Sequence, residues 1–331
     1  MPHAGETQIT GELWQPAWLR ERTFYKVTAR NRQGEQALAP PWWGSFDFQL
    51  FEELEDSVDS IFGAIFKFKF PPLGSNGIDQ DQLPPTYVVA FRGTMTDKDL
   101  MLDLKLIFGG IQRRYRVQCA IKAIKSIARA DTNIWVAGHS LGSTVGHLAG
   151  KEIFKANPEA KIDYYLFNPP FPSLFVPSLE ILKINSEVKH VLHYSRSCII
   201  NGIDCLQNDR CQRNELDKLF AELSQWVPNL FLNLSDPICA VYVGYFNRRK
   251  EMGSRAGSRR IEGRAARISV QALMKHAMGF KNWGPEHLLP SAHLTIANNP
   301  SGEFLRAHAL QEGWQPNMEY QCERHVFNEM I

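Results

Sequence analysis

One stretch of the chain, residues 133–149 (NIWVAGHSLGSTVGHLA), restricts the possible folds more than any other. Residues 133–137 are mostly apolar and typical of a short buried strand, and the apolar spacing from Leu141 onward is helical. The pattern Gly-x-Ser-x-Gly lies between them, with Ser140 at its centre. A strand, this pattern and a helix in immediate succession predict a nucleophile elbow, a sharp turn that lifts a serine hydroxyl above a sheet. The alternative is a glycine-rich turn whose serine has no chemical role.

The length and composition are those of a globular protein. With 331 residues the chain suffices for one large α/β domain or two small ones, and its 44% apolar and 22% charged residues are ordinary. The net charge of +2 gives no indication of a nucleic-acid partner. No apolar run approaches the about 18 residues of a membrane span, and the N-terminus lacks a secretory signal pattern. We therefore expect no nucleic-acid partner and no stable membrane insertion.

The cysteines and the lack of cofactor motifs bear on location and chemistry. The six cysteines follow no spacing typical of a metal site or a disulfide scaffold: Cys119, Cys198, Cys205, Cys211, Cys239 and Cys322. We expect reduced thiols in a cytoplasmic protein. The sequence has no HExxH motif, no P-loop and no strand–GxGxxG–helix unit. It therefore predicts no metal and no nucleotide or redox cofactor.

Strands and helices are predicted to alternate through the first half of the chain. Residues 1–40 are expected to form an N-terminal arm, and residues 60–70 a half-exposed strand whose lysines suit a sheet edge. Continuous apolar runs at residues 87–91 and 162–167 predict buried strands, and residues 112–130 have the period of a helix. This alternation indicates βαβ units and a mostly parallel sheet.

The second half of the chain departs from this alternation at two places. Residues 171–226 have helical spacing and predict an insertion, which either caps the strand ends or packs as ordinary helices. Strands are expected at residues 229–233 and 291–297, the latter as the last of the sheet. Residues 247–267 hold eight Lys or Arg against two Glu and predict a solvated mobile loop, with a membrane or RNA contact as the alternative.

The chain contains an acid of the kind that a catalytic serine requires. A serine hydroxyl needs a base to accept its proton, and that base needs a carboxylate to orient it. Downstream of an elbow the acid comes first and the histidine second. Asp236 is the predicted acid because it follows the strand at 229–233 and Pro237 fixes a turn after it. Asp204 and Asp209 are alternatives by order, although their helical surroundings suit surface charges better.

Five histidines follow the predicted acid and are candidates for the base: His276, His287, His293, His308 and His325. His308 is the predicted base because it lies in a short helical stretch beyond the strand at 291–297. His293 lies within that strand and would have to reach the site from inside the sheet. His139 and His147 are poor candidates, since their places beside the serine and on the next helix aim them elsewhere.

Backbone N–H groups near the elbow are candidates for stabilising an oxyanion. Leu141 begins the predicted helix, so its N–H would point at a developing negative charge. Thr94 follows the strand at 87–91 directly after Gly93, and its N–H is the second predicted donor. Arg92 is expected to hold this loop by hydrogen bonds rather than to contact a substrate.

Three motifs carry a resemblance to a known family: FRGT at 91–94, GHSLG at 138–142 and SDPI at 235–238. In this order they resemble the class 3 (fungal-type) lipases of the α/β-hydrolase superfamily. Longer segments, among them QALAPPWW, LFNPPFPS and HLLPSAHLTIANNPS, are similar to a plant group often labelled GDSL esterase/lipase, although the chain has no GDSL motif. The resemblance covers roughly residues 20–325.

The pattern and the resemblance together predict an α/β-hydrolase domain over residues 41–325, with 171–226 as its cap and 326–331 as a tail. The site residues that the resemblance implies are Ser140, Asp236 and His308 as the triad and Thr94 and Leu141 as oxyanion donors. Its usual glycine after the histidine is Ala309 here. We expect a serine esterase that cleaves a hydrophobic lipid or aromatic ester through an acyl-enzyme. The alternatives are a ligand-binding protein or receptor without turnover, and an acyltransferase.

Overall fold

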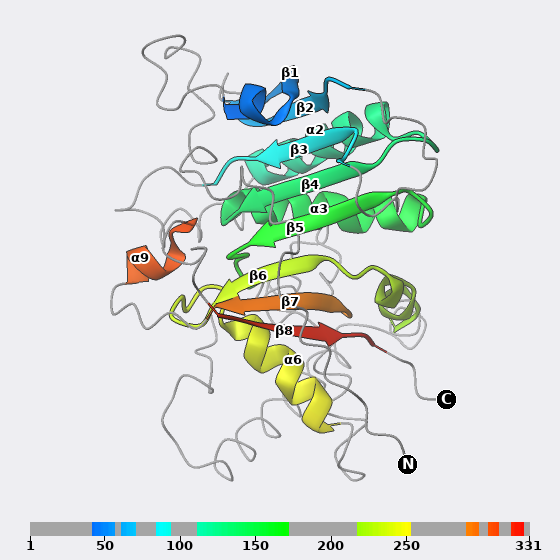
Figure 1. Ribbon diagram of the computed structural model, residues 1–331. Helices are drawn as coiled ribbons and strands as arrows, with labels where there is room; N and C mark the ends of the chain where they lie inside the picture. Colours follow the sequence, from blue (N-terminus) through cyan, green and yellow to red (C-terminus); the bar gives the residue numbers. More distant parts are fainter. Residues whose placement is uncertain are drawn as a thin grey trace, which may run out of the picture.

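Eight strands form one sheet, and their order across the sheet is their order along the chain (Figure 1). The computed structural model describes the following residues, to which every structural statement refers: 42–56, 61–70, 84–93, 111–171, 217–252, 289–297, 304–310 and 319–327. The strands are β1 Phe48–Glu55, β2 Ile61–Phe68, β3 Tyr87–Phe91, β4 Ile134–His139, β5 Ile162–Phe167, β6 Asn229–Asn233, β7 Ala292–Ala297 and β8 Tyr320–His325.

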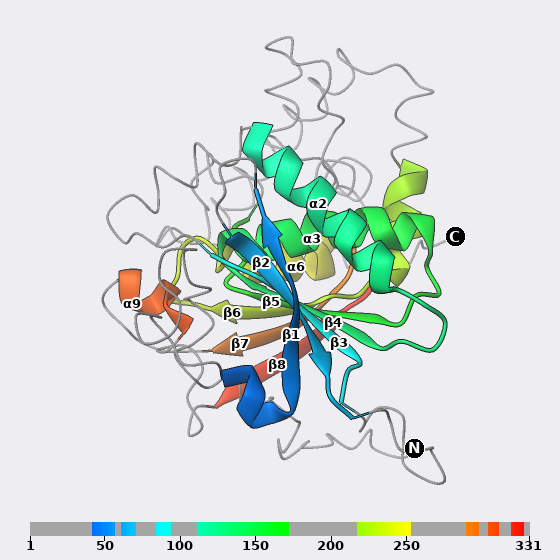
Figure 2. The same cartoon turned by 90° about the horizontal axis from the view of Figure 1, so that it is seen from above.

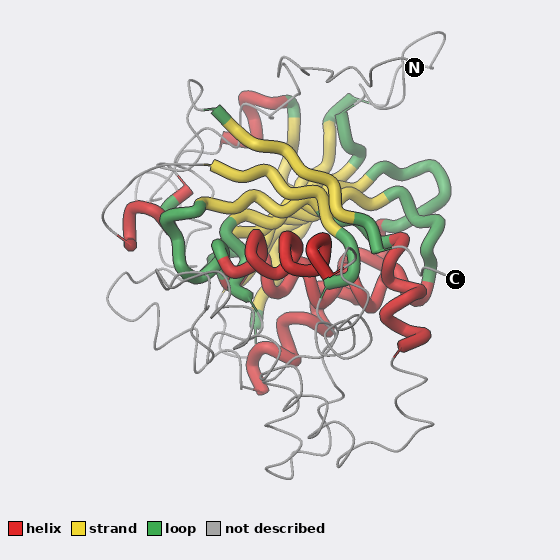
Figure 3. Tube along the Cα trace, turned by 90° about the horizontal axis from the view of Figure 1, so that it is seen from below, coloured by secondary structure: helices red, strands yellow, loops and turns green. Residues whose placement is uncertain are grey.

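The central strands β3 to β7 are all parallel, which confirms the predicted alternation. Each crossover leads to the next strand in the same direction, and right-handed crossovers of that kind put their helices on one face of the sheet. Figures 2 and 3 show the three long helices together on that face. They are α2 Ile111–Ile127, α3 Leu141–Ala156 and α6 Val241–Met252. Side chains from all three share the main apolar core with the sheet.

The opposite face of the sheet carries a second, smaller apolar cluster. Phe48, Phe66 and Val88 are buried there, and a short 3-10 helix, η4 Trp42–Phe46, packs on them through Trp43 and Phe46. The rings of Trp43 and Phe66 lie 5.4 Å apart. The sheet is therefore covered on both faces in the region of β1 to β3, as a mostly parallel sheet requires.

The predicted edge strand lies inside the sheet. β2 pairs with β1 on one side and β3 on the other, both antiparallel, so β1 forms the edge. The alternation of Phe and Lys that suggested an edge occupies only the end of β2, where the Lys67 ammonium lies 5.8 Å from the centroid of the Tyr87 ring. A lysine with a long apolar stem can thus end a buried strand as well as an exposed one.

One further prediction in the second half is wrong, and another is wrong over its first six residues. The strand at 291–297 is not the last, because β8 pairs antiparallel with it and forms the other edge. The basic segment 247–267 begins as helix, since α6 extends to Met252. Arg249 on α6 lies against four aromatic rings, so its charge is packed within the protein rather than freely solvated.

Several predictions fall outside the described residues. They concern the arm at 1–40, most of the insertion at 171–226 and the rest of the basic segment. The end of the insertion is described: residues 217–222 are helical and lead into a 3-10 turn, Leu223–Gln225. None of the helices in the described part of the chain is long and apolar enough to span a membrane.

Candidate active site

Ser140 lies in a sharp turn between β4 and α3, as the elbow pattern predicts. Its backbone has φ of 52° and ψ of −119°, a left-handed conformation that residues with a side chain rarely adopt. Three hydrogen bonds hold this turn. The Ser140 N–H donates to the Phe167 carbonyl at 3.0 Å, and the Thr144 N–H (3.2 Å) and the Ser143 hydroxyl both donate to the Ser140 carbonyl. The neighbouring strand and the first turn of the helix therefore both stabilise the strained position.

The two glycines of the elbow are required by close backbone contacts. A Cβ atom on Gly138 would lie 2.4 Å from the Gly142 carbonyl carbon, and one on Gly142 would lie 2.2 Å from the Phe91 carbonyl oxygen. Both distances are shorter than any that real Cβ atoms show. The pattern Gly-x-Ser-x-Gly thus lets the turn fold back on itself and lets α3 begin against the end of β3.

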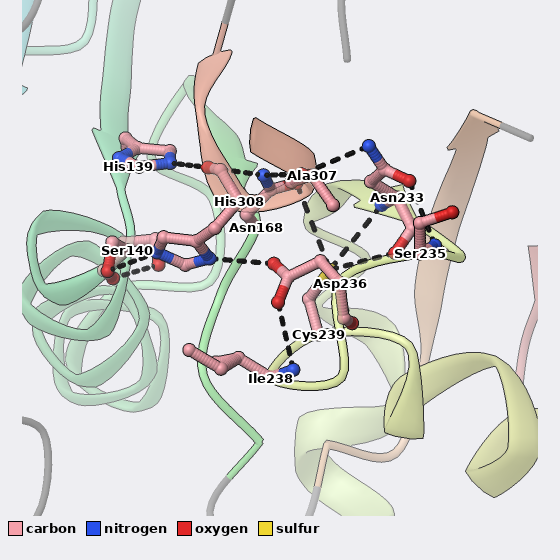
Figure 4. A network of polar contacts seen from close by, with 11 residues as sticks. His139, Ser140, Asn168, Asn233, Ser235, Asp236, Ile238, Cys239, Ala307 and His308 are labelled. Atoms are coloured by element: carbon pink, nitrogen blue, oxygen red, sulfur yellow. Dashed lines mark hydrogen bonds and ion pairs between the residues drawn. The ribbon is translucent and has the colours of Figure 1, made fainter. Parts of the chain in front are cut away.

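A chain of hydrogen bonds joins Ser140, His308 and Asp236 (Figure 4). The His308 Nε2 atom lies 2.8 Å from the Ser140 hydroxyl, and its Nδ1 atom lies 2.7 Å from an Asp236 carboxylate oxygen. A carboxylate only accepts, so Nδ1 carries the proton and Nε2 is left to accept one from the serine. All three residues are buried, with exposed fractions of 1%, 4% and 0%.

The three residues come from different parts of the chain, but all of them lie at the carboxyl ends of the parallel strands. Ser140 follows β4, Asp236 lies in the turn after β6, and His308 ends the short helix α9, Phe304–His308, beyond β7. The carboxyl ends of parallel strands meet at the same edge, which is why distant residues become neighbours.

Backbone hydrogen bonds orient the Asp236 carboxylate. The carboxylate oxygen that does not face His308 accepts the Ile238 N–H at 2.9 Å. The Asp236 backbone N–H donates to the Asn233 carbonyl at 3.0 Å. The buried Cys239 thiol lies in the same turn, and burial together with the Asp236 charge raises its pKa well above the usual value. That thiol is therefore protonated at neutral pH and is a poor nucleophile.

His293, a candidate for the base, lies elsewhere. It is on β7, half-buried, and its Nδ1 is 3.3 Å from the Asn229 side-chain oxygen. Burial and the nearby Arg324 charge lower its pKa. His325, another candidate, is on β8 beside Glu323 at 2.9 Å. The remaining candidates for the acid and the base lie outside the described residues: Asp204, Asp209, His276 and His287.

The predicted oxyanion donors are described in part. Leu141 is the first residue of α3, whose first N–H groups have no acceptor within the helix. Thr94 lies outside the described residues, but Gly93 before it is in place. A Cβ atom on Gly93 would lie 2.9 Å from the His139 carbonyl oxygen, so the chain leaving β3 passes directly against the elbow.

Three polar residues around His308 had no signal in the sequence. His139, Asn168 and Asn233 are buried, and each contacts the main-chain carbonyls of α9 (Figure 4). Burial lowers the pKa of His139 well below its usual value, and a positive charge on His308 lowers it further. His139 is therefore neutral at neutral pH.

Among the described residues, no three His, Cys, Asp or Glu side chains lie together as metal ligands.

Comparison with known proteins shows what this chain is similar to. No model of a known protein family matches the chain. The chain is similar to a curated protein of Arabidopsis thaliana named GDSL esterase/lipase At4g10955, with 32% identity over 335 aligned positions. The alignment covers 95% of this chain and 89% of the relative. The similarity thus extends over nearly the full length of both proteins.

Proposed function

Because the chain belongs to the esterase/lipase family of its Arabidopsis relative, and is a carboxylic ester hydrolase, we propose that it cleaves esters through an acyl-enzyme on Ser140. One observation carries the proposal, the hydrogen-bonded chain from the Ser140 hydroxyl through His308 to Asp236. This arrangement supplies a nucleophile, a base and an orienting carboxylate within direct contact.

In the proposed first half-reaction, the Ser140 oxygen attacks the ester carbonyl carbon while His308 Nε2 accepts the hydroxyl proton. The carbonyl oxygen becomes an oxyanion, for which the N–H groups of Leu141 and Thr94 are the proposed donors. Collapse of this intermediate breaks the bond to the alcohol oxygen, and His308 returns its proton to that oxygen. The alcohol leaves and the acyl group remains on Ser140.

In the second half-reaction, water attacks the acyl carbon and His308 accepts its proton. Collapse of the second intermediate releases the carboxylic acid, and the proton returns from His308 to the Ser140 oxygen. Asp236 stays ionised throughout and stabilises the imidazolium that forms in each half. The reaction thus consumes one ester and one water and yields an acid and an alcohol.

We assign the chain to the α/β-hydrolase fold and to the class 3 lipase type within it. Three features support this assignment: the mostly parallel sheet, the elbow between β4 and α3, and the chain order of serine, aspartate and histidine at the carboxyl ends of the strands. The domain layout, with a hydrolase domain over residues 41–325 and a cap over 171–226, is part of the proposal.

The proposed substrate is a hydrophobic ester, either a lipid or an aromatic ester. The burial of all three reacting side chains supports it, because an apolar group suits a site from which water is largely excluded. A receptor would not need all three side chains in contact, which favours the enzyme over a ligand-binding protein. Cys119, Cys239 and Cys322 form no disulfide, which supports a cytoplasmic location.

A fluorophosphonate probe tests the proposal directly. The wild-type protein should be labelled and should hydrolyse members of an ester panel, whereas Ser140→Ala should do neither while keeping its melting temperature. His308→Ala should abolish acylation because Ser140 loses its proton acceptor, and His293→Ala is the matched control that should keep most turnover per folded molecule. Labelling of Ser140→Ala, or full acylation by His308→Ala, would rule out this assignment.

A further inference from the structure

The helix that carries His308 is too short to hold its own position. α9 has five residues and ends at His308 itself. Isolated helices need about 12 or more residues to be stable in water, and the last four carbonyls of any helix lack partners within it. The main chain of Ala307 and His308 is buried, so their carbonyls must find donors elsewhere in the protein.

Three side chains supply those donors. The His308 carbonyl accepts two hydrogen bonds, from His139 Nε2–H at 2.8 Å and from Asn168 Nδ2–H at 2.9 Å. The Ala307 carbonyl accepts one from Asn233 Nδ2–H at 3.0 Å and a longer one from Asn168 Nδ2–H at 3.5 Å. Figure 4 shows the three side chains converging on this turn. Because a carbonyl only accepts, the contact also places the proton of neutral His139 on Nε2.

The donors come from three adjacent strands, at the same ends that deliver the nucleophile and the acid. His139 is the last residue of β4 and directly precedes Ser140. Asn168 follows β5, and Asn233 is the last residue of β6, three residues before Asp236. Each contact therefore ties the base to the strand ends on which its two partners stand.

Each donor is itself held in place. Asn168 has φ of 42°, a left-handed conformation that asparagine tolerates, and its N–H donates to the Phe231 carbonyl at 2.8 Å. The side-chain oxygen of Asn233 accepts the Ser235 N–H at 3.0 Å, which turns its amide toward α9. The His139 ring lies against the His308 ring, with their centroids 5.0 Å apart.

We propose that His139, Asn168 and Asn233 form a carbonyl clamp that positions His308 for proton transfer. The clamp residues donate to main-chain carbonyls of α9 and would act through His308, so they are positioning residues. The clamp fixes the main chain from which the imidazole extends, and Asp236 fixes the rotation of the ring. This inference rests on the proposed function, because it concerns the same serine and histidine.

His139→Leu against His139→Gln tests the clamp. Glutamine places an N–H donor close to the position of the histidine Nε2, whereas leucine fills the space without a donor. His139→Leu should lower kcat about tenfold with KM unchanged, and the double variant His139→Leu/Asn168→Gly about 10²-fold, because a misplacement of about 1 Å costs on that order. His139→Gln should retain most of the wild-type kcat.

A second readout does not depend on turnover. The Nδ1–H proton of His308, bonded to Asp236 at 2.7 Å, should give a strongly deshielded proton NMR resonance, assigned by its loss in His308→Asn. Loss of the clamp should shift and broaden this resonance in His139→Leu and leave it in place in His139→Gln. If the wild-type protein has no esterase activity, the proposed function fails while this measurement still decides on the clamp.

Two outcomes with the His139 variants would overturn the proposal: wild-type kcat and an unmoved resonance in His139→Leu, or equal losses in the leucine and glutamine variants. Should His139→Leu not fold, Asn168→Gly alone removes the second donor to the same carbonyl and suits the left-handed backbone. That variant should show the same loss of kcat and the same change of the resonance. An unaffected kcat and resonance in folded Asn168→Gly would equally overturn the clamp.

Discussion

Replacing Gly142 by alanine should open the elbow, because the new methyl group would collide with the backbone of β3. Its Cβ would lie 2.2 Å from the Phe91 carbonyl oxygen, and real Cβ contacts stay beyond 3.0 Å, so the two must separate by about 0.8 Å. Phe91 cannot give way as a flexible side chain would, because it is paired with β2 and β4 on either side. Overpacking costs about 1–3 kcal/mol, and a collision between main chains belongs at the upper end, about 3 kcal/mol.

Gly146→Ala is the matched control one turn further along α3. There the Cβ would lie 3.2 Å from a Leu166 methyl and 3.4 Å from a Val136 methyl, which can yield by a few tenths of an ångström. The gain in helix propensity, about 1 kcal/mol, offsets that adjustment. Its free energy of unfolding should therefore stay within about 1 kcal/mol of wild type.

Urea unfolding of wild type, Gly142→Ala and Gly146→Ala measures the difference in the free energy of unfolding. Fluorophosphonate labelling of the folded fraction adds a functional measure. Gly142→Ala should label about 10²-fold more slowly, because a shift near 0.8 Å only two residues from Ser140 disturbs the contact with His308. Equal stability and labelling of Gly142→Ala and Gly146→Ala would refute the close approach of α3 to β3.

Two further predictions concern buried charge. The pKa of His139 is lowered by burial and then by the charge on His308, so the unfolded chain takes up this proton near pH 6.5 before the folded chain does. The free energy of unfolding of wild type relative to His139→Gln should thus be at its full value above pH 6.5 and fall by up to about 1.4 kcal/mol per pH unit below it. Urea midpoints at several pH values measure this change. A difference between the two proteins that does not vary with pH would contradict the prediction. Arg249 donates to the Pro290 carbonyl at 2.6 Å and lies over four rings, so Arg249→Lys should cost about 2 kcal/mol in the same assay. Lys250→Ala, at an exposed neighbour, should cost less than about 0.5 kcal/mol, and equal losses would count against the aromatic packing.

Features determined by a short run of residues were predictable from the sequence. The elbow follows from the apolar strand, the two glycines and the helical spacing around Ser140, all within about 20 residues. The buried parallel strands β3, β5 and β6 follow from continuous apolar runs. Burial on both faces leaves such a strand no polar position, and this makes its signal strong.

The edge strands lacked such a signal. β1 (FQLFEELE) has a run of exposed residues with two acidic side chains, and β8 (YQCERH) has no buried residue at all. A strand at the edge of a sheet is stabilised by backbone pairing with its neighbour, and that pairing leaves little trace in the side chains. Both strands were therefore missed.

The residues of the proposed site could be named from the sequence, but the groups that support them could not. Chain order and strand ends pointed to Ser140, Asp236 and His308, and the structure places these three side chains in contact. Asn168 and Asn233 carry no pattern, because their donors meet carbonyls 140 and 74 residues away in the chain. Such contacts depend on tertiary arrangement alone, which no local pattern of residues encodes.

The sequential strand order also has a consequence for how the protein folds while the ribosome synthesises it. Because each strand pairs with the one made just before it, the sheet can grow by one strand at a time during synthesis, without waiting for a distant partner. Ser140 and His308 are 168 residues apart, a gap of about 10–30 s at the usual pace of translation. If His308 is the base, as proposed, the nascent chain carries its serine without one until the residues beyond β7 have emerged. On the proposed mechanism, it gains activity only when His308 has been added and has reached Ser140.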